Sequence, residues 1–119
     1  MKKHAALIIE DDPTLNEIMS ITLRDDFEIE TCADGIAGLN RLKESTPHIV
    51  VLDLNLPGTS GREILDTILA DARFANTRLI ITTADERQAE TLTDEVDIVL
   101  LKPVSPVQLR ELALRLRSM

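Results

Sequence analysis

Short apolar runs alternate with longer amphipathic stretches along the whole chain. The apolar runs lie at residues 5–9, 27–31, 49–52, 79–82 and 96–101. Four of them are almost continuously apolar, which is typical of parallel strands buried on both faces. The run at 27–31 alternates apolar residues with Glu28 and Glu30, so it is expected to form an edge strand with one face in solvent.

The stretches between these runs have the spacing of amphipathic helices. Helix starts are expected where an N-cap residue, in two cases followed by proline, precedes the apolar pattern, at Asp12-Pro13, Asp34-Gly35, Ser60 and Ser105-Pro106. The residues expected to face the core are Leu15, Ile18, Met19 and Thr22 in the first helix, Ile64, Leu65, Ile68, Leu69 and Ala72 in the third, and Leu109, Leu112, Ala113 and Leu116 in the last. The polar segment 85–95 offers only Ala89 and Leu92 as apolar anchors, which predicts a short or frayed fourth helix.

Five strand–helix units predict an α/β fold, a doubly wound parallel sheet with helices on both faces. The length suits one domain, residues 1–119, because no linker, repeat or low-complexity tract interrupts the pattern. The last helix is expected to run almost to residue 119, which fits either a single-domain protein or one domain of a longer chain.

Composition narrows the classes of function. Thirteen basic and 21 acidic residues give a net charge of −8, which argues against direct nucleic-acid binding because contacts with phosphates need clustered Lys and Arg. The apolar runs are much shorter than the ~18 residues of a membrane-spanning helix, so no membrane association is expected. The single Cys32 cannot form an internal disulfide; it fits a reducing cytoplasm and is expected to be buried at a strand end.

Acidic residues gather where the first and third apolar runs end. Glu10 and Asp11 follow residues 5–9, and Asp53 closes the run at 49–52 ahead of a Pro-Gly turn. Ligands of open α/β sheets bind at the carboxyl ends of the strands, where these side chains meet if the two strands are neighbours. Carboxylates about 4 Å apart repel by roughly 4 kcal/mol, and Mg²⁺ relieves this repulsion. The backbone carbonyl of Asn55 is a candidate further ligand.

Two more polar groups end the fourth and fifth runs. Thr83 brings a hydroxyl and Lys102 an ammonium to the same edge, and Pro103 is expected to fix the turn that aims the lysine. Together these parts suit a phosphoryl group, whose charge a cation and Lys102 would neutralise. Asp53 would be the nucleophile that forms an acyl phosphate, with Thr83 donating a hydrogen bond to a phosphoryl oxygen.

The order of these motifs resembles the receiver domain of two-component response regulators, over the whole chain. The matching motifs are Glu10-Asp11, Asp53 with Asn55-Leu56-Pro57 and Gly61 behind it, Thr83-Ala84 and Lys102-Pro103. The resemblance implies a flavodoxin-like fold with strand order 2-1-3-4-5. It also implies a signalling domain rather than an enzyme, one that catalyses only its own phosphorylation and dephosphorylation.

By this resemblance Asp53 accepts a phosphoryl group from the phosphohistidine of a sensor histidine kinase or a phosphotransfer protein. Thr83 and Lys102 read the phosphoryl group, and the switch is expected on the face built from the fourth helix, fifth strand and fifth helix. Asp12 does not match a direct ligand and is assigned to the N-cap of the first helix. The implied Mg²⁺ ligands are Glu10, Asp11, Asp53 and the backbone carbonyl of Asn55.

The chain departs from the family pattern in the part that reads out phosphorylation. Val99 stands where receivers usually carry an aromatic side chain or histidine, and valine is stiff at χ1 with no ring to swing. Val104 replaces another aromatic residue, and the segment between Thr83 and Lys102 is shorter than usual. These departures suggest that phosphorylation is transmitted by ordering of the loop and helix at 85–95 rather than by an aromatic rotamer.

Alternative hypotheses stay open at this point. The altered read-out positions motivate a receiver-like scaffold that binds a partner without being phosphorylated. An aspartyl phosphatase or a nucleotide-binding protein is disfavoured, because Asn55 stands where such a phosphatase needs a second acid and no glycine-rich phosphate loop is present. A second stripe on the last helix is a candidate surface for a homodimer or an acidic partner: Val107, Arg110, Leu114 and Arg117.

Overall fold

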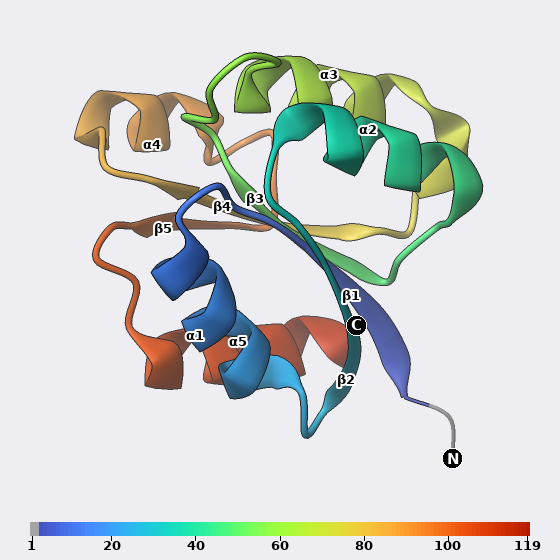
Figure 1. Ribbon diagram of the computed structural model, residues 1–119, viewed down its shortest axis with the longest axis vertical. Helices are drawn as coiled ribbons and strands as arrows, with labels where there is room; N and C mark the ends of the chain where they lie inside the picture. Colours follow the sequence, from blue (N-terminus) through green and yellow to red (C-terminus); the bar gives the residue numbers. More distant parts are fainter. Residues whose placement is uncertain (1–2) are drawn as a thin grey trace.

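The computed structural model describes residues 3–119, which form one sheet of five parallel strands with helices on both faces (Figure 1). The strand order is β2-β1-β3-β4-β5, as expected. The strands are β1 (His4–Ile9), β2 (Phe27–Cys32), β3 (Ile49–Asp53), β4 (Arg78–Thr83) and β5 (Ile98–Leu101). The helices are α1 (Pro13–Leu23), α2 (Gly35–Glu44), α3 (Gly61–Ala70), the short 3-10 helix η1 (Ala72–Phe74), α4 (Glu86–Leu92) and α5 (Pro106–Arg117). The single-domain assignment of residues 1–119 stays a prediction, and residues 1 and 2 lie outside the described range.

Helices cover the sheet unequally on its two faces. Helices α1 and α5 lie on one face, and α2, α3 and α4 lie on the other (Figure 1). Because successive strand residues point to opposite faces, Val51 of β3 packs in the core with Leu109 of α5, whereas Val50 and Leu52 pack in the second core with Ile64 of α3. The central strands β1 and β3 therefore serve two separate cores, which explains their continuous apolar runs.

The predicted helix starts are confirmed by side-chain caps. Oδ1 of Asp12 accepts hydrogen bonds from the backbone N–H groups of Thr14 and Leu15 at the start of α1. Equivalent caps begin α2, α3 and α5, made by Asp34, Ser60 and Ser105 respectively. Such caps satisfy backbone donors that the first helical turn leaves free.

Three residues that were expected to face the core are exposed instead. Ile18 is 41% exposed, and Leu23 is buried in its place, because α1 packs through the row Leu15, Met19 and Leu23 at four-residue spacing. Leu69 is 46% exposed in the last turn of α3, which ends at Ala70. Ala72 lies beyond α3, in η1, and is exposed.

The expectation that the fifth run is buried on both faces is also wrong. Only residues 98–101 form β5, which pairs with β4 alone and is the second edge of the sheet. Of these four residues only Leu100 is buried, and Leu101 is 44% exposed. The edge position removes one neighbouring strand and so leaves more of β5 exposed. The edge strand expected at 27–31 is confirmed as β2.

The amino-terminal edge of the sheet, opposite the carboxyl ends of the strands, carries both histidines of the chain. The rings of His4 and His48 stack with their centroids 4.4 Å apart, and burial, followed by the charge of His4, lowers the pKa of His48.

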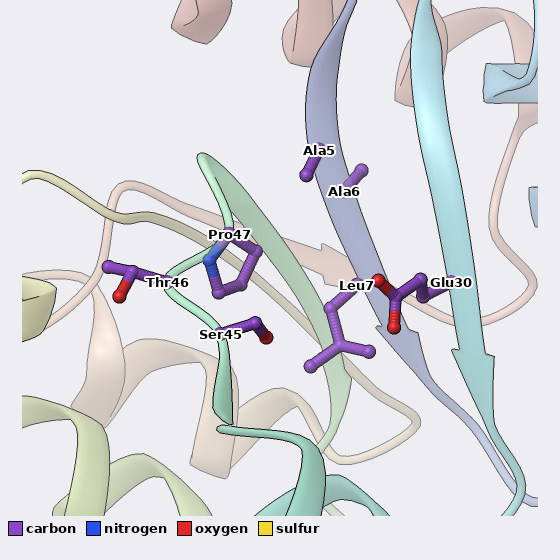
Figure 2. A pocket seen from close by; sticks show the side chains of 7 residues that line it. All are labelled: Ala5, Ala6, Leu7, Glu30, Ser45, Thr46 and Pro47. Carbon is purple, nitrogen blue, oxygen red and sulfur yellow. The ribbon is translucent and has the colours of Figure 1, made fainter. Parts of the chain in front are cut away.

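A pocket of about 60 Å³ lies near this edge (Figure 2) and is far smaller than the roughly 300 Å³ of the smallest usual ligand pockets. Its lining residues are Ala5, Ala6, Leu7, Glu30, Ser45, Thr46 and Pro47.

Cys32 is a buried free thiol at the end of β2, as expected, and burial raises the pKa of that thiol. Within residues 3–119, no helix has the length and apolar character needed to span a bilayer.

Candidate functional site

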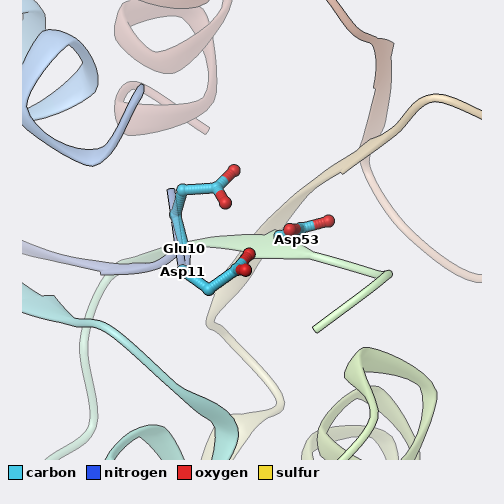
Figure 3. Close-up of side chains that lie close together, drawn as sticks. All are labelled: Glu10, Asp11 and Asp53. Atoms are coloured by element: carbon cyan, nitrogen blue, oxygen red, sulfur yellow. The ribbon is translucent and has the colours of Figure 1, made fainter. Parts of the chain in front are cut away.

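Three carboxylates meet at the carboxyl ends of β1 and β3 (Figure 3). Glu10 directly follows β1 and Asp53 ends β3; these strands pair in parallel with Ile9 opposite Leu52. One carboxylate oxygen each from Glu10, Asp11 and Asp53 lies within 4.8 Å of the others. Glu10 and Asp53 are buried, whereas Asp11 is exposed. An all-oxygen donor set with an open side fits a hard cation that keeps some of its waters, such as Mg²⁺.

The ammonium of Lys102 is the positive charge in contact with this cluster. Its Nζ lies 3.0 Å from Oε1 of Glu10 and 3.2 Å from Oδ2 of Asp53. Lys102 follows β5, and its backbone N–H donates to the carbonyl of Thr83 over 2.8 Å. The Lys102–Pro103 peptide bond is cis. The fifth strand therefore delivers its lysine across β4 to the carboxylates of β1 and β3.

Burial and mutual charge shift the pKa values of this cluster. Burial raises the pKa of Glu10 from 4.5 to about 7, although hydrogen bonds from Asp12 and Lys102 oppose the shift. Burial alone would lower the pKa of Lys102, but the hydrogen bond to Glu10 and the charge of Asp53 outweigh it and raise that pKa. Near neutral pH the cluster therefore combines a charged lysine with a glutamate that is close to its own titration point.

Backbone and amide donors fix the two buried carboxylates. The N–H of Asn55 donates to Oδ1 of Asp53 over 3.0 Å, and the N–H of Asp12 donates to Oε2 of Glu10 over 3.1 Å. The side-chain amide of Asn16 donates to the carbonyls of Glu10 and Cys32, which ties the end of β1 to the end of β2. The other oxygens of these two carboxylates, Oε1 of Glu10 and Oδ2 of Asp53, contact Nζ of Lys102, so a cation bound at the cluster in Figure 3 would share them with the lysine.

Helix α3 approaches the end of β3 closely enough to require glycine. A Cβ atom at Gly61 would collide with the backbone carbonyl oxygens of Asp53 and Leu54. Ser60 caps the same helix by accepting from the N–H of Glu63. The start of α3 therefore supports the turn that carries Asp53.

Thr83 reaches the site through a chain of hydrogen bonds. Its buried hydroxyl accepts from Nδ2 of Asn55 and from the N–H of Asp85, both at 3.0 Å. The same hydroxyl donates to Oε1 of Gln88 over 2.9 Å. Gln88 belongs to the first turn of α4, so Thr83 joins the turn after β3 to a helix beyond β4.

The structure thus brings together most of the residues singled out from the sequence. Glu10, Asp11 and Asp53 lie together, and Lys102 contacts Glu10 and Asp53. Thr83 is connected to them through the side chain of Asn55, while a ligand role for the Asn55 carbonyl stays a prediction.

Sequence reasoning missed Asn16, the side-chain amide of Asn55, and Gln88. Gln88 could have been suspected only as a polar residue in the first turn after Thr83. Val99, which stands where receivers usually carry an aromatic side chain or histidine, is half-buried against the core beneath α3, on the same side as Leu92 of α4.

Comparison with known proteins agrees with this geometry. The family described as response regulator receiver domain matches residues 6–114. The DNA-binding response regulator MtrA of Mycolicibacterium smegmatis is 32% identical over 123 residues, which cover 94% of this chain and 48% of MtrA. Hybrid signal transduction histidine kinase D of Dictyostelium discoideum is 28% identical over 120 residues, which cover 98% of this chain and 8% of that protein.

A solved structure gives the same fold. The chemotaxis response regulator CheY4 of Vibrio cholerae superimposes with a TM-score of 0.86 at 24% identity, covering 97% of this chain and 99% of CheY4. The chain spans about half the length or less of the curated relatives it matches. From its match over residues 6–114, the chain belongs to the response regulator receiver domain family.

Proposed function

We propose that Asp53 accepts a phosphoryl group from the phosphohistidine of a sensor histidine kinase or a phosphotransfer protein. A carboxylate oxygen of Asp53 attacks phosphorus, the bond from phosphorus to the imidazole nitrogen breaks, and that nitrogen keeps the electron pair. The product is an acyl phosphate on Asp53. The observation that carries the proposal is the placement of the Lys102 ammonium 3.2 Å from a buried Asp53 carboxylate at the ligand-binding edge of the sheet.

The other residues of the site have distinct roles in this proposal. Lys102 neutralises part of the charge on the transferred group, and the Thr83 hydroxyl donates to one of its oxygens. Asn55 holds the Asp53 carboxylate through its backbone N–H. Bound Mg²⁺ supplies charge neutralisation; its ligands would be Glu10, Asp11, Asp53 and the backbone carbonyl of Asn55.

The wider setting is part of the same proposal. Residues 1–119 act as one receiver domain in the cytoplasm, in keeping with the free thiol of Cys32, and catalyse only their own phosphorylation and dephosphorylation. The output surface is the face of α4, β5 and α5. A homodimer through the second stripe of α5 has weaker support, because Arg110 pairs with Asp26 and Arg117 lies over the ring of Phe27.

The scaffold hypothesis finds less support in the site. A protein that only binds a partner has no need to bury two carboxylates, whose removal from water costs several kcal/mol per ion in order-of-magnitude terms. Glu10 and Asp53 are nonetheless 0% and 2% exposed. Phosphoryl transfer uses both buried acids, Asp53 as the nucleophile and Glu10 as a ligand of Mg²⁺.

Acetyl phosphate offers a direct test without an identified kinase. The protein is incubated with Mg²⁺ and acetyl phosphate, and its intact mass is measured. We expect the mass of one added phosphoryl group, removed by hydroxylamine as an acyl phosphate would be, and absent from Asp53→Asn. The matched control is Asp25→Asn, which alters an exposed acid in the turn after α1 and is expected to be modified normally. An unmodified wild-type protein would favour the scaffold.

A further inference from the structure

We propose that Gln88 is the positioning residue that couples Thr83 to α4. In the unphosphorylated protein it holds the hydroxyl proton of Thr83, and it loses that hydrogen bond when a phosphoryl group arrives on Asp53. The inference rests on the proposed function of Asp53. In receivers an aromatic side chain usually takes part in reading out phosphorylation, and this chain has Val99 at that position. We assign the read-out to Gln88 instead.

The hydroxyl of Thr83 already makes every hydrogen bond that it can make. A threonine hydroxyl has one proton and two lone pairs. Both lone pairs are used, by Nδ2 of Asn55 and by the N–H of Asp85, each at 3.0 Å. The one proton is directed at Oε1 of Gln88, 2.9 Å away. Thr83 therefore cannot donate to a phosphoryl oxygen and to Gln88 at once, and the two acceptors compete.

A charged phosphoryl oxygen is the stronger acceptor in this competition. Hydrogen bonds to ionised groups are roughly twice as strong as bonds between neutral groups, and the oxygen of Gln88 belongs to a neutral amide. Thr83 is fully buried in the unphosphorylated protein, so water does not compete with Gln88 for its hydroxyl proton. The Thr83 hydroxyl is thus expected to donate to the phosphoryl oxygen in place of Oε1 of Gln88, and the Gln88 side chain is released.

Helix α4 has few other attachments, so this release matters. It spans seven residues, Glu86–Leu92, and Leu92 is its one buried residue. Asp85 caps its start by accepting from the N–H groups of Arg87 and Gln88. The N–H of Asp85 also donates to Thr83, but Asp85 precedes the helix, and the bond from Thr83 to Gln88 ties a side chain of α4 itself to the phosphoryl site. Loss of this bond is expected to loosen the amino-terminal end of the helix.

Hydrogen exchange of α4 amides in wild type and Gln88→Met tests the coupling. Methionine has a similar length and good helix propensity but only a weak acceptor. Without a phosphoryl mimic, Gln88→Met is expected to exchange residues 86–92 roughly fivefold faster than wild type, the effect of one lost neutral hydrogen bond. Beryllofluoride with Mg²⁺ is expected to accelerate the same amides in wild type and to add little in Gln88→Met. Glu90→Gln, an exposed change on the same helix, is the matched control and should respond as wild type does.

The outcomes separate this inference from the proposed function. If acetyl phosphate modifies wild type and Gln88→Met equally but α4 exchanges alike in both proteins, the coupling role of Gln88 is wrong and the function of Asp53 stands. A mimic-induced acceleration as large in Gln88→Met as in wild type also overturns it. Gln88→Glu keeps an acceptor oxygen and is expected to restore slow exchange in the unmodified state. Failure of wild type to gain a phosphoryl group would reject both proposals together.

Discussion

The Lys102 ammonium lies 3.2 Å from Oδ2 of Asp53, although the two residues come from strands separated by β4. The same ammonium contacts Glu10, so one lysine compensates two carboxylates that are almost completely removed from water. The charge balance at the phosphoacceptor therefore depends on a residue outside the acidic motifs. A cation or a phosphoryl group that enters the site must share these partners with Lys102.

Replacing Lys102 by methionine is expected to destabilise the protein by roughly 3 kcal/mol at a pH above 7, because it leaves buried carboxylates without a partner. The loss should be smaller near pH 5, where Glu10 is protonated, and Mg²⁺ should reverse much of it. Denaturant unfolding at the two pH values, with and without Mg²⁺, measures this. Lys43→Met removes an exposed lysine as the control. Equal losses at both pH values would contradict the charge argument.

The raised pKa of Glu10 predicts that the free energy of unfolding falls as the pH rises. Its pKa is raised from 4.5 to about 7, so the folded protein holds this proton more tightly than the unfolded chain. The contribution of Glu10 to stability is therefore lost progressively as the pH rises from 4.5 to about 7, by at most about 3 kcal/mol. The free energy of unfolding of wild type minus that of Glu10→Gln, measured across this range, should fall by such an amount. A flat difference would show that Glu10 ionises as freely in the fold as in water.

The same titration governs cation binding. Mg²⁺ requires the ionised carboxylate, so its affinity is expected to rise with pH until Glu10 is fully ionised. Calorimetric titration at about pH 5 and about pH 8 would detect protons released on binding at the lower pH. Glu10→Gln should bind weakly at both values, with no proton release from this position.

Asp12 and Asp11 are adjacent acids with separable roles. Asp12→Ala is expected to cost about 1 kcal/mol of stability by removing the N-cap of α1, while Mg²⁺ affinity is retained. Asp12→Asn keeps an acceptor and should leave both quantities near wild type. Asp11→Ala is expected to do the reverse and weaken Mg²⁺ binding with little change in stability. Strong loss of Mg²⁺ affinity in Asp12→Asn would make Asp12 a ligand.

Gly61→Ala tests the support beneath Asp53. The added methyl would meet the backbone oxygens of Asp53 and Leu54, and this overpacking is expected to cost about 1–3 kcal/mol and to slow phosphorylation of Asp53. Gly58→Ala is the matched control in the same loop. Gly58 has a φ of +71° but open space around it, so it should lose about 1 kcal/mol from backbone strain with normal phosphorylation. Equal phosphorylation rates in the two variants would show that the close approach at Gly61 does not support the turn that carries Asp53.

Local signals made much of this fold predictable. The caps at Asp12, Asp34, Ser60 and Ser105 depend on residues within one turn, and strand-end acids depend on the strand they follow. Burial was less predictable where it depends on a distant element. Ile18 belongs to the apolar pattern of α1 but lies beside the row that α5 covers. Leu101 ends an apolar run, yet β5 is an edge strand with a single partner.

The hydrogen-bond network around Thr83 shows the other limit of sequence reasoning. Thr83 and Lys102 are recognisable by their places at strand ends. Gln88 is five residues from Thr83, and nothing in its spacing reveals which acceptor the hydroxyl meets. Only the geometry of the turn between β4 and α4 decides this, just as the turn after β3 decides that the Asn55 side chain reaches Thr83.

Both imidazoles of the chain lie at the edge of the sheet remote from Asp53, His4 in the first position of β1 and His48 immediately before β3. The receiver therefore contributes no imidazole at the reacting centre when phosphotransfer is followed by nitrogen-15 spectroscopy of histidine rings. An imidazole that takes part directly in the chemistry at Asp53 must then belong to the donor protein. The loss of the phosphoryl group from a donor phosphohistidine can therefore be followed without a histidine signal from the receiver's own reacting centre.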